Sequence, residues 1–331
     1  MPGPIHPRDA LQGGVAPALL PPCEHFAGSE RQMRKALDLQ QRLGPVFDLT
    51  FDCEDGAPVG DEVGHVEMVA ALIASAHNQF DRVGVRVHDF DHPAWRHEID
   101  VLLGRAGERL AYLTIPKLAS SARAQAAIEY VQARAVHHGL RRPLPIHILV
   151  ETHGAVRDAW MIAALPWVET LDFGLLDFVS SHGGAVDESV MRSPGQFEHR
   201  LIVRAKAEVA AAALAHAIVP CHCICMDTAD PESAFQDASR ARREYGFLRM
   251  VSIHPVQIEP IVRAMSPQAA LVGRSAAVLL AGQAAQWGPI KHAGEMHDRA
   301  SYRYFWRVLQ RAKSCGMELP AEADTAFFGE K

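Results

Sequence analysis

The sequence predicts an α/β fold, a (β/α)₈ TIM barrel with a C-terminal helical extension. Over the first 265 residues, short β-branched apolar runs alternate with amphipathic helical stretches. Seven or eight strand–helix units in about 250 residues favour a closed barrel over an open sheet. Beyond residue 265 only helical patterns remain. We therefore expect a barrel domain over 1–265, with 1–22 as a loose Pro/Gly-rich leader, and a helical extension over 266–331.

Eight segments have the composition of buried strands. In chain order they are 20–26, 46–52, 83–87, 111–116, 146–150, 168–174, 217–226 and 247–253. The first is the weakest prediction, because Pro21 and Pro22 interrupt its pattern.

Helical patterns fill the intervals between these strands. Within the barrel they are 29–42, 61–77, 93–105, 120–138, 193–215 and 231–245. The first opens with Ser29 as an N-cap and Gln32 three residues later, which is the pattern of a capping box. The extension contains two further helices, 269–286 and 301–315, joined by the glycine-containing linker GPIKHAGEMHDRA.

Composition excludes several classes of protein. The chain has 331 residues, of which 48% are hydrophobic and 22% charged, as in ordinary globular proteins. A net charge of −6 argues against nucleic acid as a partner. No run of eighteen apolar residues is present, so no membrane span is expected. The N-terminus lacks the pattern of a signal peptide, and a cytoplasmic location is expected.

Six cysteines are present, and reduced thiols are expected because no export signal accompanies them. Cys221, Cys223 and Cys225 alternate along one predicted strand, which places their sulfurs on one face. Zinc sites usually need closer-wrapping C-x₂₋₄-C knuckles. We interpret the three thiols as core packing rather than as metal ligands.

Charged or titratable residues follow nearly every predicted strand at the same end. In barrel order they are Glu54 and Asp55, Arg86 with His88 and Asp89, Lys117, Glu151, Asp177, Asp227 and His254. The C-terminal ends of barrel strands form the face where barrel enzymes carry out chemistry. The sequence therefore predicts an active site at this face.

The chemistry that suits this set is metal catalysis with oxygen ligands. Glu151 and Asp177 follow consecutive strands, so their carboxylates can converge on one ion. A hard divalent ion takes one or two protein carboxylates and fills its shell with substrate and water. We expect Mg²⁺, with Mn²⁺ as the alternative, chelated by a 2-oxo acid or hydroxy acid. Arg86 can hold a substrate carboxylate or neutralise oxyanion charge.

Each of these residues also has a purely structural interpretation. A carboxylate at a strand end is often a helix N-cap or a salt-bridge partner. Arg86 can form a salt bridge to Glu54 or Asp55, with or without a role in binding substrate. Lys117 and His254 each follow or precede a proline and can serve the turn alone.

Seven segments resemble the HpcH/HpaI aldolase/citrate lyase family, in the branch of the citrate lyase β-subunit and malyl-CoA lyase. They span about residues 26–312 in the family's order. The segments are FDCEDGAP (51–58), VGVRVH (83–88), LTIPK (113–117), LVETHG (149–154), DFGLLDF (172–178), EYGFLRMVSIHPVQIEPI (244–261) and AGEMHDRASYRYFWRVLQRA (293–312).

The resemblance implies roles for particular residues. It implies metal binding by Glu151 and Asp177, and acid–base assistance from Glu54 and Asp55. The substrate would contact residues in three of the matching segments: Arg86, Lys117, Gly174 and Leu176. The C-terminal segment would supply Asp298 to a neighbouring subunit's site, which implies a homo-oligomer, a trimer or hexamer.

The implied reaction is reversible carbon–carbon cleavage of a 3-hydroxy acid, or of its CoA thioester, into an enolate fragment and a 2-oxo acid. The family's RSxLFVPG segment, which helps to place CoA phosphates, appears here only as CEHFAGS (23–29). The use of CoA is therefore left open. Two other functions remain as alternatives: a thioesterase or Claisen-type synthase on the same metal centre, and a non-catalytic accessory subunit.

Overall fold

The computed structural model describes residues 5–11 and 16–329, which form two compact units. One unit is Ala16–Met265 and the other combines the described part of the first fifteen residues with those from Ser266 onward. Within the described ranges no helix is long and apolar enough to cross a bilayer.

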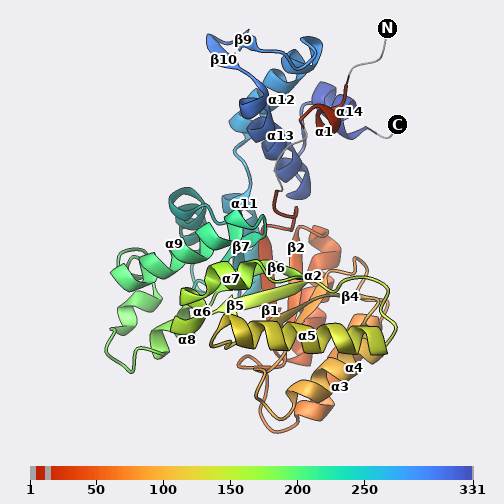
Figure 1. Ribbon diagram of the computed structural model, residues 1–331, viewed down its shortest axis with the longest axis vertical. Helices are drawn as coiled ribbons and strands as arrows, with labels where there is room; N and C mark the ends of the chain where they lie inside the picture. The colour runs from red at the N-terminus through yellow and green to blue at the C-terminus, as the bar shows by residue number, and fades with distance from the viewer. Residues whose placement is uncertain (1–4, 12–15, 330–331) are drawn as a thin grey trace. The chain divides into compact units, whose positions relative to one another are not determined.

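The first unit is a closed barrel of eight parallel strands, as predicted (Figure 1). Each strand pairs with its neighbour in sequence, and β1 closes the ring against β8. The strands are β1 Cys23–Ala27, β2 Phe47–Asp52, β3 Val83–Arg86, β4 Leu110–Ile115, β5 Ile146–Val150, β6 Val168–Phe173, β7 Val219–His222 and β8 Arg249–Ser252. The seventh is shorter than the predicted segment, so only Cys221 of the three alternating cysteines lies in a strand.

Helices connect the strands and cover the outside of the barrel (Figure 1). The main ones are α2 Glu30–Leu43, α3 Glu62–Ala74, α4 Trp95–Ala106, α5 Ser121–His137, α9 Arg200–Ala215, α10 Pro231–Arg240 and α11 Ile258–Met265. Shorter helices follow β5 and β6: α6 His153–Arg157, α7 Ala159–Ala163 and α8 Leu175–Ser180. Ser29 and Gln32 form the predicted capping box at the start of α2.

Short turns of other helical types complete the barrel unit. The 3₁₀ turns are η1 Glu188–Met191, η2 Gly195–Phe197 and η4 Pro255–Gln257, and η3 Ala241–Tyr245 is a π-helical turn that extends α10. The predicted helix 193–215 therefore begins with η2 and becomes α-helical only at Arg200.

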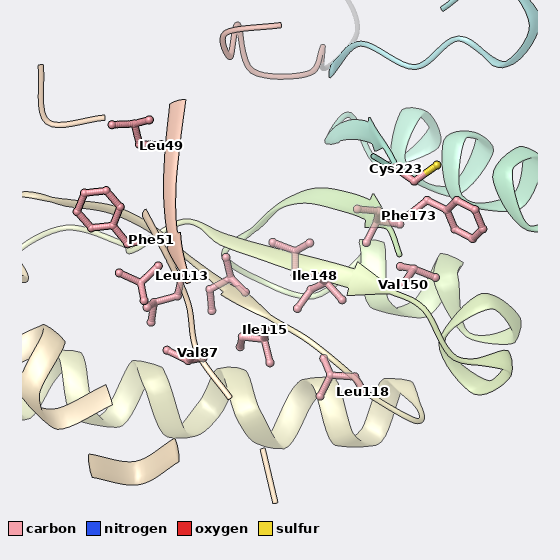
Figure 2. Close-up of a cluster of buried hydrophobic side chains, with 14 of the residues drawn as sticks. Leu49, Phe51, Val87, Leu113, Ile115, Leu118, Ile148, Val150, Phe173 and Cys223 are labelled. Carbon is pink, nitrogen blue, oxygen red and sulfur yellow. The ribbon is translucent and has the colours of Figure 1, made fainter. Parts of the chain in front are cut away.

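An apolar layer lies between the strands and the surrounding helices. Figure 2 shows part of it, where Leu113, Ile115 and Ile148 from β4 and β5 lie beside Val87 and Leu118. All of these side chains are buried. Burial of such side chains is the main source of stability and holds the strand ends in fixed register.

The interior of the barrel is polar at the level of Glu24 and His147. Glu24 and His147 approach to 3.7 Å (Oε2–Nδ1) although β1 and β5 are not neighbours, so this contact crosses the lumen. Arg249 Nη2 lies 2.7 Å from Asp48 Oδ2 and 3.4 Å from Glu24 Oε2. Burial opposes ionisation of Glu24, but Arg249 and His147 hold its pKa down at about 2. Ionised groups therefore replace the branched aliphatic layers usual in such barrels.

The second unit contains α12 Ala269–Ala284, the hairpin of β9 Ile290–His292 and β10 Glu295–His297, α13 Arg299–Ser314, and α14 Ala321–Phe328. Its core includes Leu279, Tyr302 and Leu309. The hairpin and α14 were not predicted, because three-residue strands and a short polar-flanked helix give little periodic signal.

The described part of the predicted leader is ordered. Residues Pro7–Ala10 form α1, and Trp287 Nε1 donates to the Ile5 carbonyl at 3.0 Å. We expected 1–22 to be loose and to belong with the barrel. Instead residues 5–11 are part of the second unit, while 1–4 and 12–15 lie outside the described residues.

The alternating thiols are buried, and burial raises the pKa of Cys223 to about 11 and that of Cys225 to about 12. These thiols are therefore protonated at neutral pH, which suits packing better than metal binding. Only Cys221 has two carboxylates close enough to share an ion, those of Glu24 and Asp172.

Candidate active site

A cavity of about 350 Å³ opens at the C-terminal ends of the strands. Its lining brings together six of the residues predicted for the site. These are Asp55, Arg86, Glu151, Gly174, Leu176 and Asp177. They come from β2, β3, β5 and β6 or the segments directly after them, so the register of the barrel places them at one mouth.

Glu151 is a deeply buried carboxylate in this cavity. It is the first residue after β5 and is only 2% exposed. The backbone N–H of Lys117 donates to its Oε1 at 2.7 Å, which fixes the orientation of the carboxylate. A Cβ at position 174 would lie 2.3 Å from its Oε2, so glycine is needed there to leave room for Glu151.

Asp177 lies in the first turn of α8, and its side chain is 36% exposed. Burial, and then the charge of Asp177, raise the pKa of Glu151 to about 8. A buried carboxylate whose ionisation is disfavoured by burial and by a neighbouring carboxylate forms, with that neighbour, a site for a cation. The two carboxylates offer oxygen ligands that are open to a cavity, and Mg²⁺ usually takes one or two carboxylates from a protein. The residues present therefore fit the predicted metal.

Arg86 is held by two carboxylates beside the cavity. Its Nε and Nη2 donate to Asp52 Oδ1 and Oδ2 at 2.7 and 2.5 Å, and its Nη1 lies 3.1 Å from Glu54 Oε2. Burial would lower the pKa of Arg86, but the Asp52 carboxylate raises it above its ordinary value. The expected pairing with Glu54 is present, whereas Asp55 is not a partner of Arg86.

The side chain of Lys117, a predicted substrate contact, lies among carboxylates at the barrel mouth. Its Nζ donates to Glu54 and, at 2.9 Å, to Asp55, and it lies 3.9 Å from Asp177 Oδ1. Lys117 is not part of the cavity lining. The ammonium group of Lys117 thereby links the carboxylates of the segment after β2 to Asp177. The backbone of Lys117 has an unusual φ of +54°.

Glu54 and Asp55 differ in their access to the cavity. Glu54 is 8% exposed and is enclosed by Arg86 and Lys117. Asp55 lines the cavity. Burial opposes ionisation of Asp55, but the Lys117 ammonium lowers its pKa, so it is a carboxylate at neutral pH. Of the pair, Asp55 is the one that can reach a substrate.

Asp298 belongs to the second unit, where it caps a helix. Its Oδ1 accepts from the N–H groups of Ala300 and Ser301 at the start of α13, and Ser301 completes a capping box. This local role accounts for an aspartate at this position. A role of Asp298 in a neighbouring subunit's site stays a prediction.

Asp52 was missed by the sequence analysis, although it lines the cavity and holds Arg86. It also accepts from the N–H groups of Glu54 and Gly56, so it shapes the loop after β2. The available signal was the alternation Asp48–Thr50–Asp52, which places three polar residues on one face of β2.

Comparison with known proteins identifies relatives of this chain. The family model HpcH/HpaI aldolase/citrate lyase matches residues 48–255. An L-malyl-CoA/beta-methylmalyl-CoA lyase of Cereibacter sphaeroides is 26% identical over 281 residues, which cover 80% of this chain and 87% of that protein.

Solved structures agree with this similarity. A citrate lyase from Burkholderia xenovorans LB400 is 48% identical, with a TM-score of 0.86, and the match covers 98% of this chain and 100% of that one. Protein CitE of Mycobacterium tuberculosis, in complex with magnesium, acetoacetate and coenzyme A, shares the fold at 21% identity and a TM-score of 0.67, over 89% of this chain and 98% of that one.

Proposed function

The chain belongs to the HpcH/HpaI aldolase/citrate lyase family, and from this premise we propose that it is a Mg²⁺-dependent carbon–carbon lyase. Its substrate would be a 3-hydroxy acid or the CoA thioester of one, and its products an enolate-derived fragment and a 2-oxo acid. The observation that supports this most is the buried Glu151, which lines the same cavity as Asp177 and whose pKa is raised by burial and by the Asp177 charge.

Glu151 and Asp177 would hold the ion at the mouth of the barrel. When bound, the ion supplies a Lewis acid that binds the oxygens of an oxo acid and stabilises developing negative charge. The relatives support this choice, because the CitE complex contains magnesium. Gly174 would leave room for the carboxylate of Glu151, and Leu176 would border the bound substrate.

Cleavage needs a base that takes the proton of the substrate's hydroxyl group. Asp55 is the candidate, since it lines the cavity and is ionised beside Lys117. As the carbon–carbon bond breaks, its electron pair becomes an enolate on the acyl fragment. Arg86 would stabilise that charge with the N–H groups that Asp52 and Glu54 leave unused.

The second unit would complete the site from another subunit. The family resemblance implies that Asp298 does so in a homo-oligomer, and we keep this as part of the proposal. The carboxylate of Asp298 already accepts two backbone N–H groups at α13, so its free oxygen Oδ2 would be the atom offered to a neighbour.

A cleavage assay tests the proposal. We expect purified protein to release a 2-oxo acid only with Mg²⁺ from a 3-hydroxyacyl-CoA that carries a carboxylate on C3, and Asp177→Asn to lower this rate at least about 100-fold. The 2-oxo acid and free CoA are measured separately. Release of CoA without a 2-oxo acid would instead identify a thioesterase, and release of neither from any 3-hydroxy acid or thioester would contradict a lyase.

A further inference from the structure

The mouth of the barrel is divided into a charged sector and an apolar sector. Residues from β2, β3, β5 and β6 contribute the charged groups of the cavity lining. The same strands and the segments after them also contribute the apolar Leu149, Phe173, Leu175 and Leu176. The lining residues from β7, β8, β1 and the segments after them include no charged side chain. The apolar sector consists of Phe26, Cys223, Ile224, Val251 and Ile253. The two sectors face each other across the cavity, because these three strands are consecutive in the closed ring.

The charge in the cavity is strongly negative. Its described lining holds four carboxylates, those of Asp52, Asp55, Glu151 and Asp177, and a single cationic side chain, Arg86. With all of them ionised the lining is three charges negative, and a divalent ion reduces this to one. A bound monocarboxylate adds one further negative charge. A second substrate carboxylate would add another where no lining cation is left to meet it.

Arg86 cannot serve as that cation in the usual way. A guanidinium recognises a carboxylate with two parallel N–H groups. Here that fork is already taken by Asp52, and Nη1 is beside Glu54. The remaining N–H groups can support an oxyanion, but they do not offer a free fork to a substrate carboxylate.

The chelate geometry places the rest of the substrate in the apolar sector. A 2-oxo acid that binds an ion through its carboxylate and keto oxygens forms a five-membered ring. The substituent on its keto carbon then points away from the ion. A substituent that extends across the mouth from Glu151 and Asp177 would lie against the lining residues from β7, β8 and β1.

We propose that the oxo-acid fragment of the substrate carries a single carboxylate and an uncharged, apolar substituent. Dicarboxylic oxo acids, of which oxaloacetate is the smallest, would be discriminated against. This inference rests on the proposed function, because it takes the metal site for granted. Its basis is the division of the lining into two sectors and the occupied fork of Arg86.

A matched pair of probes tests the proposal on the intact protein. 2-Oxopentanoate and 2-oxoglutarate have the same five-carbon chain and differ only in a terminal methyl or carboxylate. Isothermal titration with saturating Mg²⁺ should show 2-oxopentanoate binding at least about tenfold more tightly. Equal binding, or tighter binding of 2-oxoglutarate, would overturn the inference.

A variant of the apolar sector provides the converse test. Ile253 is 39% exposed, so Ile253→Lys can be accommodated without burying a charge. It should lower the preference for 2-oxopentanoate over 2-oxoglutarate at least about threefold, since it supplies the missing cation. Ile253→Met is the matched control of similar length and should keep the wild-type preference. An unchanged preference in Ile253→Lys would remove Ile253 from the substituent's path and contradict the placement.

Failure of this inference is separable from failure of the proposed function. If neither probe, nor pyruvate or glyoxylate, binds with Mg²⁺, the metal and oxo-acid site itself is wrong. If they bind with Mg²⁺ but the two five-carbon probes do not differ, the lyase proposal stands and only the apolar sector loses its role.

Discussion

Glu151 is a buried carboxylate whose pKa of about 8 lies far above the usual value of 4.5. In the metal-free protein its ionisation therefore costs stability as pH rises from 4.5 through about 8, because the folded state holds the proton longer than the unfolded state does. An ion at this carboxylate must displace that proton.

Magnesium affinity is accordingly predicted to depend on pH. Below about pH 8 it should fall up to about tenfold for each pH unit, and above that value it should level off. Titrations in buffers with different heats of ionisation would detect about one proton released per ion near pH 7. Affinity that is constant from about pH 6 to about pH 8 would contradict a protonated Glu151.

Gly174 is the residue that makes room for this carboxylate. In Gly174→Ala the added methyl would lie 2.3 Å from Glu151 Oε2, so the carboxylate must move. We predict that Mg²⁺ affinity falls at least about tenfold and that the free energy of unfolding falls by about 1–3 kcal/mol. Metal titration and thermal unfolding measure the two effects.

The matched control for that change is Gly273→Ala in α12, where an added Cβ meets nothing within 4 Å. Alanine in a helix is favoured over glycine by up to about 1 kcal/mol, so stability should be kept or raised and Mg²⁺ affinity unchanged. If both alanine variants bind Mg²⁺ like the wild type, the close approach of Gly174 to Glu151 has no role in the metal site.

At the scale of elements, Asp298, the N-cap residue of α13, has two candidate roles. Asn and Asp cap helices about equally well, whereas Ala costs about 1 kcal/mol. Asp298→Asn should therefore keep the unfolding temperature, and Asp298→Ala should lower it. If Asp298 also serves the reaction, both variants lose lyase activity. Full activity in Asp298→Asn would leave this residue with a structural role only.

The strands show how much of the fold could be predicted from sequence. Their positions followed from β-branched runs, and the shared end of Glu151, Asp177 and Arg86 followed from the parallel order. The polar interior of the barrel could not be predicted from the sequence. Alternation along a strand separates two faces but does not say which faces inward, and His147 or Arg249 would ordinarily be assigned to the outside.

The site shows which of its residues could be predicted from the sequence and which could not. Glu151 and Asp177 were predicted as metal ligands from their place after consecutive strands, and the structure places both at one cavity. For Arg86 the pairing with Glu54 was among the predictions, but the pairing with Asp52 was not, because Asp52 is the last residue of β2 and was not counted among the residues of the site. The apolar sector could not be predicted either, because it forms only when β1 closes the ring against β8 and so comes beside the last two strands.

For the whole molecule, we predict a trimer or hexamer whose sites are shared between subunits. Mixing Glu151→Gln with Asp298→Asn subunits tests this. If Asp298 serves a neighbouring subunit, random mixed oligomers at equal ratio should regain about a quarter of wild-type activity, since that share of sites has both residues intact. Light scattering of the same samples gives the number of subunits. No recovery in mixed oligomers would place Asp298 outside the neighbour's site.

The central claim is that Glu151 holds a metal ion that in turn binds a 2-oxo acid. Its most direct test is calorimetric titration of pyruvate into wild-type protein and Glu151→Gln, with and without Mg²⁺, with the exposed Glu129→Gln as control. The account predicts binding only in wild type and control, and only with Mg²⁺, while Glu151→Gln stays folded. Pyruvate binding that needs no Mg²⁺, or that survives unchanged in Glu151→Gln, would contradict it.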